Sequence, residues 1–295
     1  MDHTTSPAEY PAPSALPAQP ALPDPLVTFG GGDVETVTDW KQHRRPEIRR
    51  AFEHYVYGYA PARPSIDIET KQTTTVLDGR ATLTERTIHI AELPADAPSI
   101  DLAVFTPATR DTAPVFLGLN NTGNHGVIDD SAVTITDTAA ESGLEDRGVA
   151  SEYWCLEQLI DRGYGLATFH PAAIDPDRDD PTDGIRPYYE ALPGPSVAHW
   201  GTIATWAWGL RRGVDALSED RTVETDGIAV IGHSRFGKAA LLAGALDERI
   251  DLVVPHQSGT GGVASGPPWS TARAWSPSRV SSSVRTSEST SPPSK

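Results

Sequence analysis

The stretch Gly227-Ile-Ala-Val-Ile-Gly-His-Ser-Arg-Phe-Gly-Lys238 decides the fold that we expect for this chain. Its apolar run predicts a buried strand, and the small residues that follow Lys238 predict a helix. A sharp strand-to-helix turn at Ser234 would push the serine hydroxyl out of the sheet and aim the next backbone N–H at a developing oxyanion. The stretch therefore predicts a nucleophilic serine at the end of a strand.

The spacing of the two glycines departs from the usual form of such a turn. That form is G-x-S-x-G, whereas here the second glycine comes one residue later, at Gly237. Glycines are expected at both places because side chains would clash with the strained backbone. The alternative for Ser234 is a helix N-cap without a chemical role, but the strand before it and the helix after it favour the nucleophile.

The elements around this stretch predict an α/β fold. Short apolar runs predict strands at 115–119, 165–169, 227–231 and 252–254, and periodic stretches predict helices at 153–161, 201–217 (amphipathic) and 238–246. Strands that alternate with helices indicate a mostly parallel sheet covered on both faces. Upstream, a helix is expected at 39–59, and alternating segments at 82–90 and 100–105 predict antiparallel strands at the edge of the sheet.

The composition excludes some partners. The chain has 295 residues, 38% of them hydrophobic, and 40 acidic against 24 basic residues, a net charge of −16. Nucleic acids and anionic membranes attract basic surfaces, so neither is an expected partner. Abundant aspartate with only four lysines, Lys41, Lys71, Lys238 and Lys295, is typical of proteins from salt-accumulating cells, although a GC-rich genome also favours arginine over lysine.

Targeting and cofactor signals are missing from the sequence. The first 25 residues lack a basic segment followed by an apolar one, so we expect no signal peptide and a cytoplasmic chain. No stretch is long and apolar enough to span a membrane. No cluster of ligand residues predicts a metal or an organic cofactor. Cys155 is the single cysteine and is expected to be a buried structural thiol.

Composition divides the chain into three parts. Residues 1–25 predict a flexible, Pro/Ala-rich lead, and residues 26–265 one α/β domain whose serine turn is typical of α/β-hydrolases; the resemblance given below implies that this α/β-hydrolase domain is partial. Residues 266–295 hold ten serines, five prolines and no aspartate, and their net charge is +3 from four basic residues and one acidic. This segment is expected to be disordered, either as a natural linker or as an out-of-frame tail.

Several motifs resemble one family, the glucuronoyl esterases of carbohydrate esterase family 15. The G-x-S-R-x-G-K form of the serine turn is the most distinctive of them. Supporting segments are Trp40-Lys-Gln-His-Arg-Arg-Pro-Glu-Ile48, Tyr55-Val-Tyr-Gly-Tyr59, Phe116-Leu-Gly-Leu-Asn-Asn-Thr-Gly-Asn-His125, Gly163-Tyr-Gly-Leu-Ala-Thr-Phe169, Trp200-Gly-Thr-Ile-Ala-Thr-Trp-Ala-Trp-Gly209 and Gly244-Ala-Leu-Asp-Glu-Arg-Ile250. The likeness covers residues 40–262.

The resemblance implies a three-layer α/β/α sandwich of the α/β-hydrolase type, incomplete at its C-terminus. It also implies cleavage of the ester between a glucuronic acid of xylan and a lignin alcohol, in a family whose members are often secreted. Ser234 would be the nucleophile, Arg235 would help to hold the oxyanion, and Lys238 would contact sugar hydroxyls. A surface ion pair with a nearby carboxylate is the alternative for Arg235.

Two partners of the nucleophile are not apparent. In one branch of the family the acid follows the serine by 23 residues in a Glu-Ser-Gly-x-Gly-Gly segment, and here that position is Gln257, in His256-Gln-Ser-Gly-Thr-Gly-Gly262. Other branches place the acid in a later loop. The base histidine comes last in this fold, yet the last histidine is His256. His125, His170 and His233 are not expected to act as the base.

The sequence therefore predicts a serine carboxylic ester hydrolase that resembles glucuronoyl esterases and has little or no activity as this chain, which is expected to be truncated. Two alternatives stay open. One is an esterase for acetylated sugars or other small esters, because a fold alone does not set the substrate. The other is a non-catalytic carbohydrate-binding relative that keeps the cleft.

Overall fold

A computed structural model describes residues 10–17, 22–178, 180–190, 200–259 and 262. Their contacts form two compact units. The larger unit consists of Ile48–Asp177 and the described residues from Pro181 onward, and the smaller one holds the described residues up to Glu47 with Arg178 and Asp180. The predicted tail at 266–295 and much of the predicted lead at 1–25 lie outside the described residues.

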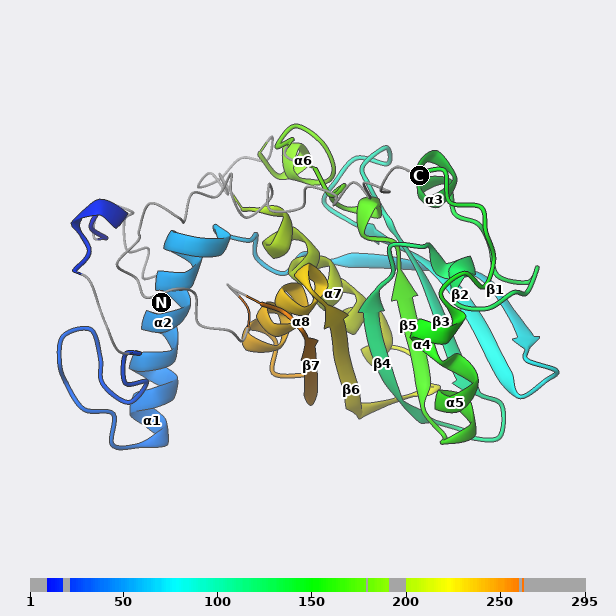
Figure 1. Ribbon diagram of the computed structural model, residues 1–295, viewed down its shortest axis with the longest axis horizontal. Helices are drawn as coiled ribbons and strands as arrows, with labels where there is room; N and C mark the ends of the chain where they lie inside the picture. The colour runs from blue at the N-terminus through cyan, green and yellow to red at the C-terminus, as the bar shows by residue number, and fades with distance from the viewer. Residues whose placement is uncertain (1–9, 18–21, 179, 191–199, 260–261, 263–295) are drawn as a thin grey trace, which may run out of the picture. The chain divides into compact units, whose positions relative to one another are not determined.

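A seven-stranded mixed sheet organises the larger unit (Figure 1). Its order is β1-β2-β3-β5-β4-β6-β7. The first four strands in this order, β1, β2, β3 and β5, pair antiparallel with one another. The pairs β5–β4, β4–β6 and β6–β7 are parallel. The strands are β1 (Ile66–Val76), β2 (Ala81–Ile90), β3 (Ile100–Pro107), β4 (Ala113–Leu119), β5 (Gly165–Phe169), β6 (Val223–His233) and β7 (Leu252–His256).

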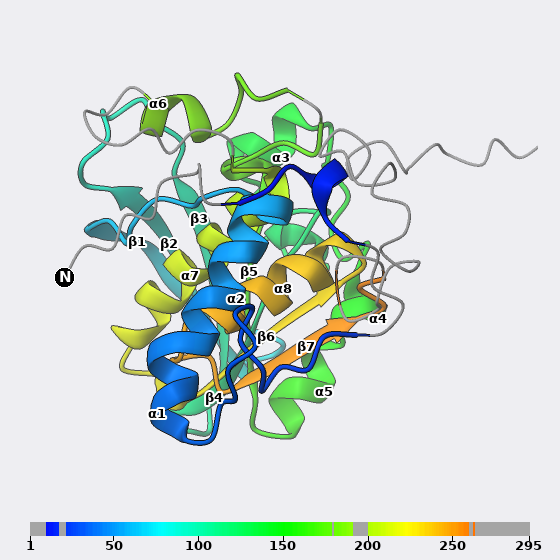
Figure 2. The ribbon, with the colours of Figure 1, turned by 90° about the vertical axis from the view of Figure 1, so that its left-hand side faces the viewer.

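Helices cover both faces of this sheet (Figure 2). On one face α7 (Thr202–Ser218) and α8 (Arg235–Leu246) bury Trp206, Leu210 and Ala239 in a core shared with β4 and β6. On the other face, α4 (Ser151–Trp154) and α5 (Leu156–Asp161) share a second core with β2 and β3. This arrangement confirms the predicted three-layer α/β/α sandwich.

The antiparallel part of the sheet differs from the prediction. The expected strands at 82–90 and 100–105 are present as β2 and β3, but the edge strand is β1, which the sequence analysis missed. Its Thr-rich run, in which β-branched residues recur, is typical of a strand. The pairing of β1 with β2 shifts register between Thr70 and Gln72, which is the mark of a β-bulge.

Two helices also differ from their predicted form. The helix expected at 153–161 is broken at Cys155, whose φ of 49° ends α4 and starts α5. The Cys155 thiol is only half-buried and donates a hydrogen bond to the Glu152 carbonyl, so the expected buried thiol was wrong. Helix α7 is buried on nearly every side, with only Thr202, Arg211 and Ser218 less than buried, because the sheet and α8 pack against it.

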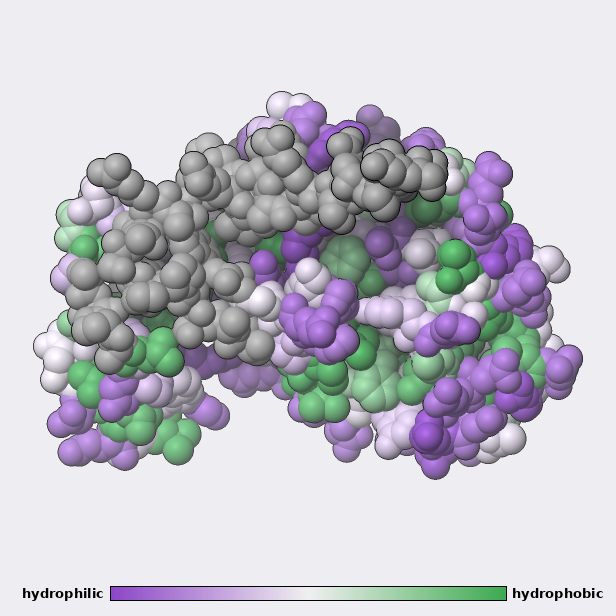
Figure 3. All heavy atoms as spheres, in the orientation of Figure 1, coloured by the Kyte–Doolittle hydropathy of each residue, from purple (hydrophilic) through white to green (hydrophobic). Residues whose placement is uncertain are grey.

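The remaining helical segments are short. Those at Val37–Asp39 (α1), Trp40–Arg44, Arg45–Phe52 (α2) and Glu53–Tyr57 account for the helix expected at 39–59. The others among the described residues are α3 (Asp137–Glu141), α6 (Arg186–Glu190) and three 3-10 turns at Pro13–Ala15, Asn124–Gly126 and Pro171–Ala173. No helix in this part of the chain is both long and apolar enough to cross a membrane. Hydrophobic side chains reach the surface among hydrophilic ones (Figure 3), and Tyr153 and Leu252 are each more than half exposed.

Candidate active site

Ser234 lies in a strained turn between β6 and α8. Its φ of 56° and ψ of −117° are rare for a residue with a side chain, and the residue is exposed at the carboxyl end of the parallel strands. The turn is held by the backbone, because Ser234 N donates to His256 O at 3.0 Å and Lys238 N donates to Ser234 O at 3.2 Å. The predicted strand-to-helix turn is confirmed.

Two glycines make this turn possible. A Cβ on Gly232 would lie 2.2 Å from the Phe236 carbonyl oxygen, and a Cβ on Gly237 would lie 2.9 Å from the Gly232 oxygen. The tight approach is thus between residue 232 and the peptide that joins 236 to 237. This explains the shifted second glycine, because the later position is the one that touches Gly232.

The alternative for Ser234, a helix N-cap, holds for its backbone position but not for its side chain. Ser234 occupies the N-cap position of α8, but its side chain makes no capping hydrogen bond. Among the described residues no group forms a hydrogen bond with the Ser234 hydroxyl, which therefore stays available to a ligand.

Arg235, the first residue of α8, forms an ion pair beside the serine. Its Nη1 donates to Asp177 Oδ1, and the two side chains are 28% and 40% exposed. The alternative stated for Arg235, a surface pair with a carboxylate, thus describes its present contact. The position next to Ser234 nevertheless leaves the guanidinium at the site, where it can turn toward a developing negative charge.

Asp177 belongs to a firmly anchored loop that follows β5. Two residues before it, Asp175 is completely buried and accepts from Arg186 Nη2 at 2.9 Å. The Asp175 carbonyl accepts from Trp206 Nε1 on α7, also at 2.9 Å. Burial raises the pKa of the Asp175 carboxyl to about 6, although Arg186 opposes the shift. These contacts fix the loop beneath Asp177.

Lys238 lies one helical turn beyond Arg235, so both cations belong to the first turn of α8. Burial and, second, the charge of Arg235 lower the pKa of the Lys238 ammonium. Between them Phe236 packs edge-on against Trp206, with ring centroids 4.9 Å apart. This contact holds the first turn of α8 against α7.

Gln257, at the position of the family acid, contacts His233 and not a histidine that follows it in the chain. Its Oε1 lies 2.9 Å from His233 Nε2, and the His233 ring centroid lies 5.2 Å from that of His256. Gln257 adopts a left-handed φ of 47° directly after β7. An amide oxygen can orient an imidazole but, unlike a carboxylate, carries no charge, so this contact can only orient the His233 ring.

The segment after β4 also lies at the carboxyl end of the parallel strands. Asn120 is buried; its Nδ2 donates to the Gly123 carbonyl at 2.7 Å and its Oδ1 accepts from the Thr122 backbone at 3.1 Å. Asn120 N donates to the Phe169 carbonyl, which ties the segment to β5. α/β-Hydrolases often take a second oxyanion N–H from the loop after such a strand, and here it would come from this rigid turn.

Two histidines in the loops after β4 and β5, His125 and His170, are poor bases. His125 is completely buried, and burial lowers the pKa of its imidazole. His170, 7% exposed, has its pKa lowered to about 4, again by burial. An imidazole of such low basicity cannot efficiently take the proton of a serine at neutral pH. Within the described residues no group of three His, Cys, Asp or Glu side chains could hold a metal.

Comparison with known proteins settles the family. A family model described as "Glucuronyl esterase, fungi" matches residues 138–290, which is 153 of the 295 residues. The chain belongs to the glucuronyl esterase family. Members of this family are carboxylic ester hydrolases. The match runs into residues 266–295, the segment that we predicted to be a disordered tail and that the structure does not describe.

Individual relatives agree with this family. A carbohydrate esterase from an unknown prokaryotic organism is 38% identical over 263 residues, covering 82% of this chain and 60% of that protein. A 4-O-methyl-glucuronoyl methylesterase from Phanerochaete carnosa is 28% identical and matches 82% of the chain and 50% of its own length. The chain therefore spans 50 to 60% of the length of these two curated relatives.

Solved structures of the family share the fold. A glucuronoyl esterase from Solibacter usitatus has a TM-score of 0.76 at 36% identity, over 85% of this chain and 67% of that one. A promiscuous CE15 esterase from a marine bacterial metagenome has a TM-score of 0.73, also at 36% identity, over 86% of this chain and 66% of that one. These likenesses confirm the α/β-hydrolase type that the family resemblance implied.

The identity of the partner of Arg235, Asp177, is the main feature of the site that sequence reasoning missed. The signal was present, because Asp175-Pro-Asp-Arg-Asp-Asp180 is an aspartate-rich loop directly after a predicted strand. Loops at the carboxyl ends of parallel strands build the ligand sites of α/β folds. The sequence alone could not tell which of its aspartates would reach the serine turn.

Proposed function

We propose that this chain carries the nucleophile of a uronate ester hydrolase, with Ser234 as the attacking group. The observation that supports this most is the strained, exposed Ser234 at the carboxyl edge of the sheet, with the cations Arg235 and Lys238 on the next turn. Strain of this kind in a family of ester hydrolases favours a chemical role over a packing role.

The reaction that fits these groups is acyl transfer. The Ser234 oxygen attacks the ester carbonyl carbon, its proton passes to a base, and the carbonyl oxygen gains negative charge that Arg235 stabilises. Collapse of this intermediate breaks the bond to the alcohol, which leaves with the proton. Water then attacks the acyl-serine and releases the uronic acid and free Ser234.

No described histidine forms a hydrogen bond with the Ser234 hydroxyl: His125 and His170 are buried, His233 is hydrogen-bonded to Gln257, and the exposed His256 contacts the serine turn through its backbone carbonyl. We therefore expect the 295-residue chain to hydrolyse esters slowly. Serine hydrolases that lack members of their triad keep about 10³- to 10⁴-fold rate enhancement over water from binding and the oxyanion hole.

The substrate class that we propose is an ester of glucuronic acid, as in links between xylan and lignin. Lys238 would contact the sugar hydroxyls and Arg235 the reacting carbonyl group. Support for the class comes from curated relatives named 4-O-methyl-glucuronoyl methylesterase, at 28 to 30% identity. A broader substrate range is a second candidate, favoured by the 36% identical relative that is described as a promiscuous esterase.

An assay with a Ser234→Ala control tests this proposal. In high salt the chain is expected to cleave methyl glucuronate slowly and acetyl-xylose more slowly still, and Ser234→Ala should reduce the uronate rate to background. A rate that survives Ser234→Ala contradicts the nucleophile assignment. Faster cleavage of acetyl-xylose would favour the second candidate, whereas rapid uronate turnover would show that a described histidine does act as the base.

A further inference from the structure

We propose that Asp177 makes the site select neutral uronate esters over the anionic uronic acid. Asp177 would do so by staying paired with Arg235 until an oxyanion forms at the ester carbonyl. This inference rests on the proposed function and adds to it a residue that discriminates substrate from product. The pair of Arg235 Nη1 with Asp177 Oδ1, beside the exposed Ser234, is the observation that carries it.

The position of Asp177 is fixed by the fold. Asp175 below it is held through its carboxylate by Arg186 and through its carbonyl by Trp206. Gly184, at φ 64°, allows the returning chain to pass directly beneath, since a Cβ there would lie 2.4 Å from the Ile174 oxygen. Asp177 therefore presents its charge to α8 from an anchored loop, although the carboxylate itself is 40% exposed.

The charges at the site explain why such a residue is needed. Arg235 and Lys238 alone would give the first turn of α8 two positive charges, and a helix N-terminus adds further positive potential. The ester substrate is neutral at its reacting carbon, whereas its hydrolysis product is a carboxylate. Without a counter-ion, the two cations would hold the product more tightly than the substrate and slow its release.

Asp177 removes this imbalance. A uronate carboxylate that approaches Arg235 must displace the Asp177 carboxylate or lie next to it, and like charges a few ångströms apart repel. A neutral ester meets no such repulsion. During reaction the oxyanion forms covalently within reach of Arg235, so the guanidinium can transfer to it and then return to Asp177 once the acid has formed.

Ligand titration of the full chain tests the inference. In a Ser234→Ala background, which prevents turnover, Asp177→Asn is expected to bind glucuronate about three- to tenfold more tightly, the effect of one partly exposed charge. Its affinity for methyl glucuronate should change less than twofold. The gain for glucuronate should shrink in molar salt, because salt screens exposed charges.

Asp226→Asn is the matched control, because Asp226 is an exposed aspartate on β6, away from the carboxyl end. It removes the same net charge and should leave both affinities unchanged. If Asp177→Asn leaves glucuronate binding unchanged, or weakens the binding of both ligands as loss of a positioning contact would, then the inference is overturned while the proposed function stands. If neither ligand binds to any variant, the proposed function fails and the inference with it.

Discussion

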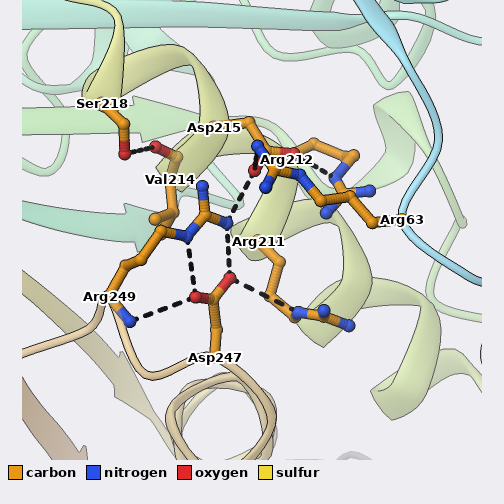
Figure 4. Close-up of polar contacts among 8 residues, drawn as sticks. All are labelled: Arg63, Arg211, Arg212, Val214, Asp215, Ser218, Asp247 and Arg249. Carbon is orange, nitrogen blue, oxygen red and sulfur yellow. Dashed lines mark hydrogen bonds and ion pairs between the residues drawn. The ribbon is translucent and has the colours of Figure 1, made fainter.

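At the carboxyl ends of β6 and β7, Ser234 is exposed and the side chains of Arg235 and Asp177 are partly exposed, whereas two carboxylates near the amino ends of the same strands, Asp215 and Asp247, are buried and contact arginines (Figure 4). Asp215, in the last turn of α7, is 2% exposed and contacts three arginines. These are Arg63 at 3.0 Å, Arg212 at 2.8 Å and Arg249 at 2.6 Å. This buried cluster thus joins three segments that are distant in sequence.

Asp247, just after α8, extends this cluster. It is 6% exposed, accepts from Arg249 Nη2 at 2.6 Å and lies 3.5 Å from Arg211 Nε. Asp251, four residues later, is by contrast exposed and accepts a hydrogen bond from the Ile228 backbone N–H beside the start of β7.

The comparison shows how burial changes what an ion pair does. Arg212 is completely buried, and although Asp215 opposes the effect, burial lowers the pKa of its guanidinium to about 10. A buried cation depends on its carboxylate, because losing one partner leaves an uncompensated charge. The pair of Arg235 and Asp177 is partly solvated, so water can replace either partner. We call the buried cluster around Asp215 the closed end and the carboxyl ends of the strands, with Ser234 and Arg235, the open end. We expect the closed end to govern stability and the open end to govern ligand binding.

The largest expected effect is that of Asp215→Asn. It should lower the free energy of unfolding by about 3–5 kcal/mol, because it leaves Arg212 charged and buried without a carboxylate. Urea unfolding monitored by tryptophan fluorescence measures this. The control is Glu157→Gln, whose 63% exposed carboxylate pairs with Arg80 and should cost at most about 1 kcal/mol. Equal losses in the two variants would show that burial is not the deciding factor.

The next largest effect is a pH dependence that originates at the open end. The pKa of His170 is lowered to about 4 in the folded chain, against about 6.5 when unfolded. Above pH 6.5 both states are neutral there; as the pH falls toward 4, only the unfolded state gains the proton. His170 should therefore remove about 3 kcal/mol of stability between pH 7 and pH 4.

His170→Asn isolates this contribution, since all other titrating groups are common to both chains. The difference in unfolding free energy between wild type and His170→Asn should shift by the stated amount from pH 7 to pH 4. Parallel stability curves for the two chains would show that the folded His170 is not held neutral.

A smaller effect is expected at the serine turn. Gly232→Ala places a Cβ 2.2 Å from the Phe236 carbonyl oxygen, and the overpacking should cost about 1–3 kcal/mol. Gly201→Ala, at the N-cap of α7, is the control because its Cβ would meet nothing closer than 3.7 Å. In Gly232→Ala the turn must shift, so any Ser234-dependent hydrolysis should also fall. Unchanged stability would mean that the turn is looser than the structure indicates.

Sequence patterns predicted the parallel half of the molecule better than the rest. Apolar runs at 115–119 and 165–169 gave the positions of β4 and β5, since strands buried on both faces are apolar throughout. Strand β1 was missed because one of its faces is largely exposed and its apolar residues are sparse. Burial of α7 on almost all sides could not be predicted either, because it depends on α8 packing against the polar-looking face.

At the site, local pattern predicted the serine turn but not the contacts around it. Ser234, Gly232 and Gly237 are close in sequence, and their geometry follows from the backbone. Asp177 lies 58 residues from Arg235, and its contact depends on how the loop after β5 packs. Gln257 was identified as the residue at the acid position, but its bond to His233 requires the parallel register of β6 with β7.

The smallest expected effect completes the comparison. Asp177→Asn changes the same chemical group as Asp215→Asn, yet it should alter the free energy of unfolding by less than about 1 kcal/mol, because its ion pair with Arg235 is partly exposed. The loop should stay in place, since its anchors are Asp175, Arg186 and Trp206. Urea unfolding of the two variants side by side, in low and in molar salt, measures the contrast. A loss of several kcal/mol for Asp177→Asn would mean that the pair at the open end holds the fold as the closed end does, and the division between a stabilising and a ligand-binding end would have to be abandoned.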